Sequence, residues 1–403
     1  MRKQFLLLLI LCLTASMAWA ERIDVATARK VAESVARREG STGGLRSAGE
    51  LPLVYAAAPG QSGSALRSGA MEGAADYFVF NFPGGKGFAI VAGDDRVRPV
   101  LGYSDEGGFD PDNLPENLRG WLAGYQTQIT WAVNKGIEAT PEIAAEWSQL
   151  MSGTALRATQ EPVLLNTARW NQGEPYNRQT PVFDTEHAVT GCVATALGIV
   201  MRYHEYPDIV TSDERITSYY QLPVTYETYD WSKMPLVYAP GYSEEEANAV
   251  ATLMWNIGAN VEMDYGIGGS GAITSNAILK LNTVFGYSEE AQFVWKSDYR
   301  WAEWKQMVRA ELDNGRPVIY SGYNTKVGHA FICDGYKENE AFHINWGWGG
   351  SGNGYFLLTA LDSDGGDDPF VLSGMGIGIR PPEAGDTKPH TLSLIHISEP
   401  TRH

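Results

Sequence analysis

Cysteine is scarce in this chain of 403 residues, which contains only Cys12, Cys192 and Cys333. Cys12 lies in an apolar N-terminal segment with the features of a signal peptide, so we expect the exported chain to keep two cysteines. Two are too few for a disulfide framework, although a single bridge between them is an alternative on this count. The zinc patterns C-x-x-C and H-E-x-x-H are missing as well, and we expect neither a metal nor a cofactor.

Positive charge is also in short supply. The 48 acidic residues outnumber the 31 basic ones, which gives a formal net charge of −17. Proteins that bind nucleic acid need a basic face. We therefore expect no nucleic-acid partner.

Of two common enzyme sequence motifs, one is missing from this sequence and the other lacks the structural context that it needs. The serine-hydrolase elbow G-x-S-x-G does not occur. The run Gly347–Gly352 matches G-x-G-x-x-G after a predicted strand, but a second strand rather than a helix follows it. A dinucleotide site is therefore not expected there.

Long apolar runs are confined to the first twenty residues. Arg2 and Lys3 precede an apolar run from Phe5 to Leu13, and Ala18-Trp19-Ala20 has the small-residue pattern of a signal-peptidase site. The run is too short to cross a bilayer, which favours a signal peptide over an anchor. We expect residues 1–20 to be removed and the protein to be secreted, extracellular or periplasmic, without a membrane partner.

Residues 21–157, the front unit, contain no histidine and no cysteine and so have little machinery for acid–base chemistry. Helical spacing of apolar residues predicts helices at 25–38 and 114–135. Between them, 77–82 and 88–92 predict a hairpin, and 98–103 a third strand. A polar, small-residue stretch at 151–161, which contains Arg157, is the expected linker.

Residues 158–382, the second unit, are rich in Trp, Tyr and Gly and hold the four histidines His187, His204, His329 and His343. Helical patterns at 247–257 and 301–314 precede strand patterns at 318–322, 329–336, 341–346 and 355–359. Helices followed by strands indicate an α+β domain with segregated layers. Residues 383–403 continue no pattern and are expected to be a non-native or truncated tail.

Cys192 stands at the start of a predicted helix. Apolar residues at i, i+3, i+4, i+7 and i+8 from Val193 form one buried stripe, with Thr190 as the expected N-cap and Pro207 closing the segment. The first turn and the helix dipole favour a negative charge, which lowers a thiol pKa and makes the sulfur reactive. A buried structural cysteine is the alternative interpretation.

His329 lies in a strand that pairs with the strand at 341–346 across a turn. If Tyr336 faces Ala341, Phe331 lies opposite Trp346, and His329 shares their face of the sheet. A slip of one residue would move Trp346 to the other face. The prediction therefore depends on the turn.

A catalytic base needs a group that orients it. In the register above, the indole of Trp346 can shield the imidazole of His329 and fix its ring. Asn and Asp are more usual in this role, but Asn345 points away in a regular strand, and so does His343.

Five blocks in order along the chain resemble the streptopain family of papain-like bacterial cysteine peptidases, which includes interpain-type enzymes. The blocks are Trp170–Asn177, Thr190–Pro207, Met263–Gly266, Gly328–Phe331 and His343–Gly350. The hairpin at 77–92 and the run 93–104 are similar to the prodomain of that family. The resemblance covers nearly the whole chain.

This resemblance implies roles for four residues. Cys192 would be the nucleophile, His329 the base, and Trp346 would stand in place of the usual Asn. Gln172 would supply a side-chain donor to the oxyanion hole, beside the backbone N–H of Cys192.

The resemblance also implies where substrate binds. Gly328 would line the cleft, where a missing Cβ admits a peptide backbone. Ser270 and Gly271 would border a subsite. The segment Ile267–Gly269 departs from the family pattern, which leaves the subsite preference open.

The expected molecule is a secreted cysteine endopeptidase made as a zymogen. Its catalytic domain, 158–382, would have the papain-like α+β fold, with a helical subdomain and an antiparallel β subdomain. The small α+β prodomain, 21–157, would block the cleft until it is cut near Arg157, so the partners are peptide substrates and the prodomain itself. The alternatives are a papain-like amidase or acyl transferase acting on cell-wall peptides or glutamine side chains, and a catalytically decayed binding module.

Overall fold

The computed structural model describes residues 21–40, 50–59, 75–152, 161–211, 213–224, 228–323, 328–337, 341–361 and 372–383. The expected signal peptide, the processing region around Arg157 and the tail from residue 384 lie outside the described residues. Among the helices that are described, none is both long enough and apolar enough to span a membrane.

The front unit is a small sheet with helices packed on it. Its elements are α1 (Val25–Arg38), β1 (Leu53–Ala57), β2 (Tyr77–Asn81), β3 (Phe88–Ala92), β4 (Val100–Ser104), α2 (Glu116–Lys135) and α3 (Pro141–Ser152). The side chain of Asp24 caps the start of α1, and the apolar face of that helix is buried. The two predicted helices and the hairpin are confirmed, whereas α3 was not predicted.

The second unit has most of its helices before its longer strands, apart from short early strands and β8, which precedes α8, and this confirms the predicted α+β class. Its helices are α4 (Cys192–His204), α5 (Glu214–Tyr220), α6 (Glu244–Asn260), α7 (Thr274–Thr283) and α8 (Trp301–Asp313). Its strands are β5 (Val163–Leu164), β6 (Val182–Phe183), β7 (Glu186–His187), β8 (Gln292–Trp295), β9 (Val318–Tyr323), β10 (Gly328–Lys337), β11 (Ala341–Asn345), β12 (Gly354–Leu357) and β13 (Leu372–Ile377). Every residue from 193 to 201 is buried, so α4 is covered on all sides and not only along the predicted stripe.

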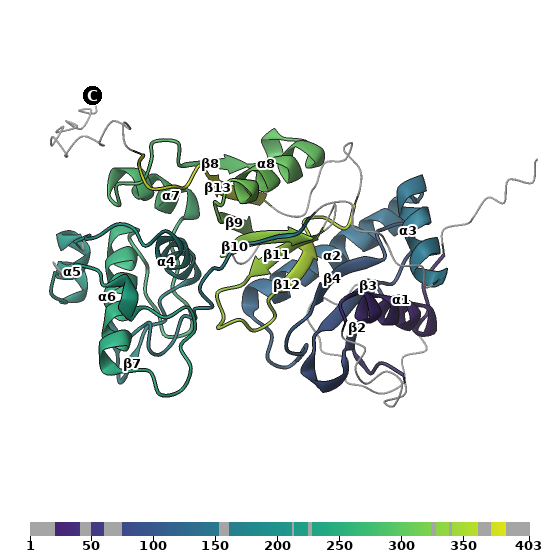
Figure 1. Cartoon of the computed structure of the whole chain (residues 1–403), viewed down its shortest axis with the longest axis horizontal. Helices are drawn as coiled ribbons and strands as arrows, with labels where there is room; N and C mark the ends of the chain where they lie inside the picture. The colour runs from purple at the N-terminus through teal and green to yellow at the C-terminus, as the bar shows by residue number, and fades with distance from the viewer. Residues whose placement is uncertain are drawn as a thin grey trace, which may run out of the picture.

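Strands from both units join in one antiparallel sheet, which the sequence did not predict. The order is β1-β2-β3-β4-β12-β11-β10-β9-β13-β8, with β5 paired to β10 off this path. At the junction, Tyr103 and Gly102 of β4 face Tyr355 and Phe356 of β12. Figure 1 shows the blue strands of the front unit beside the yellow-green strands of the second unit. Without the front unit, β12 would become an edge strand.

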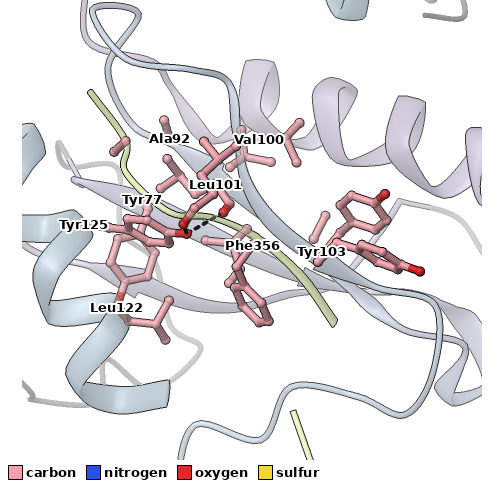
Figure 2. Close-up of a cluster of buried hydrophobic side chains, with 14 of the residues drawn as sticks. Tyr77, Ala92, Val100, Leu101, Tyr103, Leu122, Tyr125 and Phe356 are labelled. Carbon is pink, nitrogen blue, oxygen red and sulfur yellow. Dashed lines mark hydrogen bonds between the residues drawn. The ribbon is translucent and has the colours of Figure 1, made fainter. Parts of the chain in front are cut away.

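Helix α2 packs across this junction and contacts both β4 and β12. The hydroxyl of Tyr125 lies 2.8 Å from the carbonyl oxygen of Leu101 and 2.5 Å from that of Leu357, and it can donate to one of them at a time. Figure 2 shows Tyr125 of α2 reaching Leu101, with Leu122 on the same helix and Phe356 of the second unit in the same cluster. The front unit and one face of the second unit's sheet therefore share a single hydrophobic core.

The hairpin β10–β11 corrects one prediction and confirms another. Next to the turn, Lys337 rather than Tyr336 faces Ala341, so the predicted register is wrong there by one residue. A bulge between Cys333 and Gly335 then shifts the pairing, and Ile332 faces Asn345 as predicted. Phe331 therefore meets Trp346, and their ring centroids are 4.9 Å apart.

Candidate active site

Cys192 is the first residue of α4, but the expected cap is wrong. Gly191, not Thr190, is the N-cap, and no side chain caps this helix. Gly191 has φ +84°, and a Cβ there would lie 2.8 Å from the carbonyl oxygen of Ser270 and 2.9 Å from Sδ of Met263. The hydroxyl of Thr190 instead pairs with that of Thr195 at 2.9 Å. Glycine is required here because the chain turns in a left-handed conformation against a close neighbour.

The sulfur of Cys192 faces the strand that carries His329. The backbone N–H of Ala330 donates to Sγ at 3.4 Å, and α4 packs against β10. His329 immediately precedes Ala330 in the same strand. The structure thus brings the two predicted site residues to one place, although they are 137 positions apart in the sequence. Cys333, by contrast, is fully buried, and both cysteines are free thiols, so the alternative of a bridge is not realised.

The electrostatics of this state contradict the expected low thiol pKa. Burial raises the pKa of the Cys192 thiol, although the N–H groups of Ala330, Val193 and Cys192 itself oppose the rise. The carboxylate of Glu116 raises it further. Burial also lowers the pKa of His329. Both shifts favour the neutral forms of the thiol and the imidazole in this state.

Trp346 is completely buried, and a hydrogen bond and aromatic contacts fix its side chain. Its indole N–H donates to the carbonyl oxygen of Gly352 at 2.9 Å, and its ring packs against Phe331 and Phe356. Within the described part of the chain, no ring contact joins Trp346 to His329. The orienting role of Trp346 stays a prediction.

The side chains of Asn345 and His343 form hydrogen bonds to residues other than His329. The amide of Asn345 donates to the carbonyl oxygen of Ala168 at 2.9 Å and to the hydroxyl of Thr167 at 3.1 Å. The imidazole Nδ1 of His343 bonds to the carboxylate of Asp334, which also accepts from Thr167. This network fixes the segment that leads to Gln172 against the back of the hairpin.

Gln172 lies beside the start of α4. Its carbonyl oxygen accepts the N–H of Thr190 at 3.0 Å, and its own N–H donates to the side chain of Asn171 at 2.7 Å. Its backbone is therefore tied to the turn before Cys192. Its side-chain role in an oxyanion hole stays a prediction.

The three residues expected to contact substrate lie in two places. Gly328 begins β10, next to His329, and faces Tyr323 of β9. Ser270 is half-buried against the turn before Cys192, where its hydroxyl donates to the carbonyl oxygen of Val189 at 2.7 Å. Gly271 is exposed and pairs with Asp264. All three thus border the region of Cys192 and His329, and contact with substrate stays a prediction.

Sequence reasoning expected the front unit to block the cleft but did not name the residues that reach this site. The side-chain amide of Asn117, in the first turn of α2, donates to the carbonyl oxygen of Trp346 at 2.6 Å. Glu116 precedes it and acts electrostatically on both Cys192 and His329. Nothing in the sequence around residue 116 signals a partner 230 positions away.

In the described ranges, no group of three or more His, Cys, Asp or Glu side chains is arranged so that it could hold a metal ion. The site as described consists of a thiol, an imidazole, backbone N–H groups and amide side chains. These are the parts needed for acyl transfer through a sulfur nucleophile.

Comparisons with known proteins agree with this chemistry. Residues 170–356 match the Peptidase C10 family, and residues 20–129 match the Spi protease inhibitor family. Streptopain of Streptococcus pyogenes is 34% identical over 306 residues, which cover 71% of this chain and 74% of streptopain. The thiol protease/hemagglutinin PrtT of Porphyromonas gingivalis is 37% identical over 300 residues, but the match spans only 34% of PrtT.

A solved structure is similar over most of the chain. A fragment of prointerpain A of Prevotella intermedia matches with a TM-score of 0.62 and 29% identity. The match covers 78% of this chain and 98% of that fragment. The likeness therefore includes the front unit as well as the second unit.

Proposed function

The chain belongs to the C10 family of cysteine peptidases, and we propose that it is an endopeptidase whose nucleophile is Cys192 and whose base is His329. The observation that carries this assignment is the 3.4 Å contact between Sγ of Cys192 and the N–H of Ala330, the residue after His329. The first-turn position of Cys192 supports it, because helix N-termini favour thiolates once water reaches them. The buried position of Cys333 supports the choice between the two thiols.

In the proposed reaction, His329 takes the proton of Cys192, and the thiolate attacks the carbonyl carbon of a peptide bond. The side chain of Gln172 and the backbone N–H of Cys192 stabilise the oxyanion. His329 then gives its proton to the leaving amine, and water hydrolyses the thioester. Trp346 would hold the ring of His329 during these transfers.

We also propose that the protein is made as a zymogen, with residues 21–157 as prodomain and 158–382 as catalytic domain. Asn117 supports this by its bond to the carbonyl oxygen of Trp346 beside the site. Two salt bridges also join the front unit to the second unit: Lys337 pairs with Glu39 at 3.0 Å, and Arg169 pairs with Glu106 at 2.6 Å. The shared sheet and core hold the same arrangement. Activation would follow a cut near Arg157.

Latency has an electrostatic part in this proposal. The closed state keeps Cys192 partly buried, which raises its thiol pKa, and keeps the carboxylate of Glu116 near it. Departure of the front unit would admit water and remove that charge. Both changes lower the pKa of the thiol and permit the thiolate–imidazolium pair.

Export is proposed from the signal-like segment 1–20, with cleavage after Ala20. Glu21 would then become the N-terminal residue, and its backbone nitrogen lies next to a carboxylate. The backbone N–H of Glu21 donates to the carboxylate of Asp95 at 2.8 Å, and that of Ile23 donates to the carbonyl oxygen of Gly93. A new α-ammonium would thus meet a carboxylate. Sequencing the N-terminus of the exported protein tests the cleavage site.

The decisive experiment for the nucleophile is Cys192→Ala, with Cys333→Ala as the matched control. We expect Cys192→Ala to abolish casein hydrolysis and self-processing, while Cys333→Ala keeps both if it folds. Retained turnover in Cys192→Ala would end the assignment. Muropeptides and glutamine-containing peptides, assayed beside casein, separate a peptidase from an amidase or acyl transferase, and a thiol-directed epoxide separates an active site from a decayed one.

A further inference from the structure

The loop 266–271 is bonded to the segment that leads into Cys192 by one side chain, that of Ser270. Its hydroxyl donates to the carbonyl oxygen of Val189 at 2.7 Å and accepts the N–H of Gly266 at 3.1 Å. The N–H of Val189 points back to the carbonyl oxygen of Gly266 at 3.3 Å. The two segments are thus joined through both main chain and side chain.

The same loop fills the space beside Gly191. A Cβ on Gly191 would lie 2.8 Å from the carbonyl oxygen of Ser270, far inside normal contact. Ser270 therefore touches the approach to Cys192 twice: its hydroxyl binds Val189, and its carbonyl group packs against Gly191. The residue between them, Thr190, is held from the other side by the carbonyl oxygen of Gln172 at 3.0 Å.

The loop itself has a fixed base and an exposed tip. Asp264 and Gly271 exchange two main-chain hydrogen bonds at 2.9 and 3.0 Å, which close the base. Ile267 near the tip is 41% exposed. A displacement of the tip is therefore transmitted through Ser270 to the residues just before the nucleophile.

We propose that Ser270 is a positioning residue, whose hydroxyl sets the place of Val189–Gly191 and hence the aim of the Cys192 sulfur. This inference rests on the proposed role of Cys192 and goes beyond the expected part of Ser270 at a subsite. A nucleophile misplaced by about 1 Å loses roughly a hundredfold in rate. The side chain thereby couples a substrate-side loop to catalysis.

The test uses Ser270→Ala and Ser270→Thr in the activated protein, obtained by processing the full precursor. Two quantities are measured: kcat and KM for a peptide substrate, and the rate at which iodoacetamide alkylates Cys192, followed by peptide mass. Iodoacetamide is too small to need a subsite. Ser270→Ala should lower kcat about 10- to 100-fold, slow alkylation in parallel and leave KM nearly unchanged. Ser270→Thr keeps the hydroxyl and should restore most of both.

A residue that only contacts substrate behaves differently. In that case Ser270→Ala would raise KM while alkylation and kcat stayed at wild-type values, and the inference would be overturned. Ser232→Ala is the matched control, because it also removes a serine hydroxyl, here an exposed one that donates to the carboxylate of Asp230 outside this loop. It should leave kcat and the alkylation rate unchanged.

A second variant guards against poor folding of Ser270→Ala. In Gly191→Ala, the added Cβ would lie 2.8 Å from the carbonyl oxygen of Ser270 and would displace the segment Val189–Gly191, while the hydroxyl of Ser270 remains. It should also slow alkylation, and a wild-type rate would overturn the inference. Failure of the underlying function has its own signature: the wild-type protein would then hydrolyse peptides without any label appearing on Cys192.

Discussion

Replacing Trp121 by alanine tests how the front unit keeps the site of this cysteine peptidase closed. Trp121 lies in α2, and its half-buried indole enters the aromatic core of the second unit. Its ring centroid is 5.5 Å from that of Phe331, 5.9 Å from that of Tyr320 and 6.0 Å from that of Trp346, each in an edge-to-face arrangement. The change to alanine removes all three contacts at once.

The expected cost follows from these contacts. An aromatic pair contributes about 0.5–1.5 kcal/mol beyond the area that it buries. A fully buried Trp→Ala change costs about 3–5 kcal/mol. Because the indole is only half-buried, we expect about 2 kcal/mol to be lost from the closed state. At about 1.4 kcal/mol for each factor of ten, the open fraction of the precursor should rise about 30-fold.

The assay is the rate of iodoacetamide labelling of Cys192 in the uncleaved precursor, followed by intact mass. When opening and closing are fast, this rate follows the open fraction, so the label should appear about 30-fold faster in Trp121→Ala. Trp131→Ala is the control, since Trp131 lies in the same helix and no ring contact joins it to the described residues of the second unit. Labelling of Trp121→Ala at the wild-type rate, with fast labelling after activation, would refute the reasoning.

Three further predictions concern the same molecule. Because burial raises the pKa of Cys192 in the closed state, its labelling rate should rise only at high pH, and activation should move the curve to lower pH; an unmoved curve contradicts the electrostatic account. In protein that begins at Glu21, Asp95→Asn should lower Tm by about 1 °C at pH 7, since an ion pair worth up to about 1 kcal/mol is lost. The pairing raises the folded pKa of the α-ammonium, so its contribution is complete below about pH 8 and vanishes at higher pH, and extra residues before Glu21 should abolish the difference. Trp346→Phe keeps most of the packing but loses the bond to Gly352; a fall in kcat of tenfold or more in folded protein supports the orienting role, and wild-type turnover removes it.

Local patterns foretold most of the helices and strands near the site. Helices over 25–38 and 301–313 and strands β2, β3 and β10 appear within a few residues of their predicted bounds, because amphipathic spacing reflects which side of an element is buried. The N-cap of α4 was missed, since Thr190 is a common cap by type but Gly191 alone tolerates the positive φ beside Ser270. The bulge in β10 was missed, although Gly335 lies beside it and a glycine inside a strand pattern often marks a bulge.

The sequence by itself determined the kind of chemistry: a cysteine at a helix start, a histidine in a strand with glycine near both ends, and a front unit without either residue type. Only the tertiary structure decided the state of that chemistry. The pKa of Cys192 depends on how deeply its sulfur is buried and on Glu116, which is 76 positions away, so helix position alone predicted the wrong direction. The union of the two units in one sheet is likewise a matter of long-range pairing between β4 and β12. Short-range patterns indicate which residues favour a buried position or a turn. The actual burial of a group, and the charges around it, depend on segments that come together only in the folded chain.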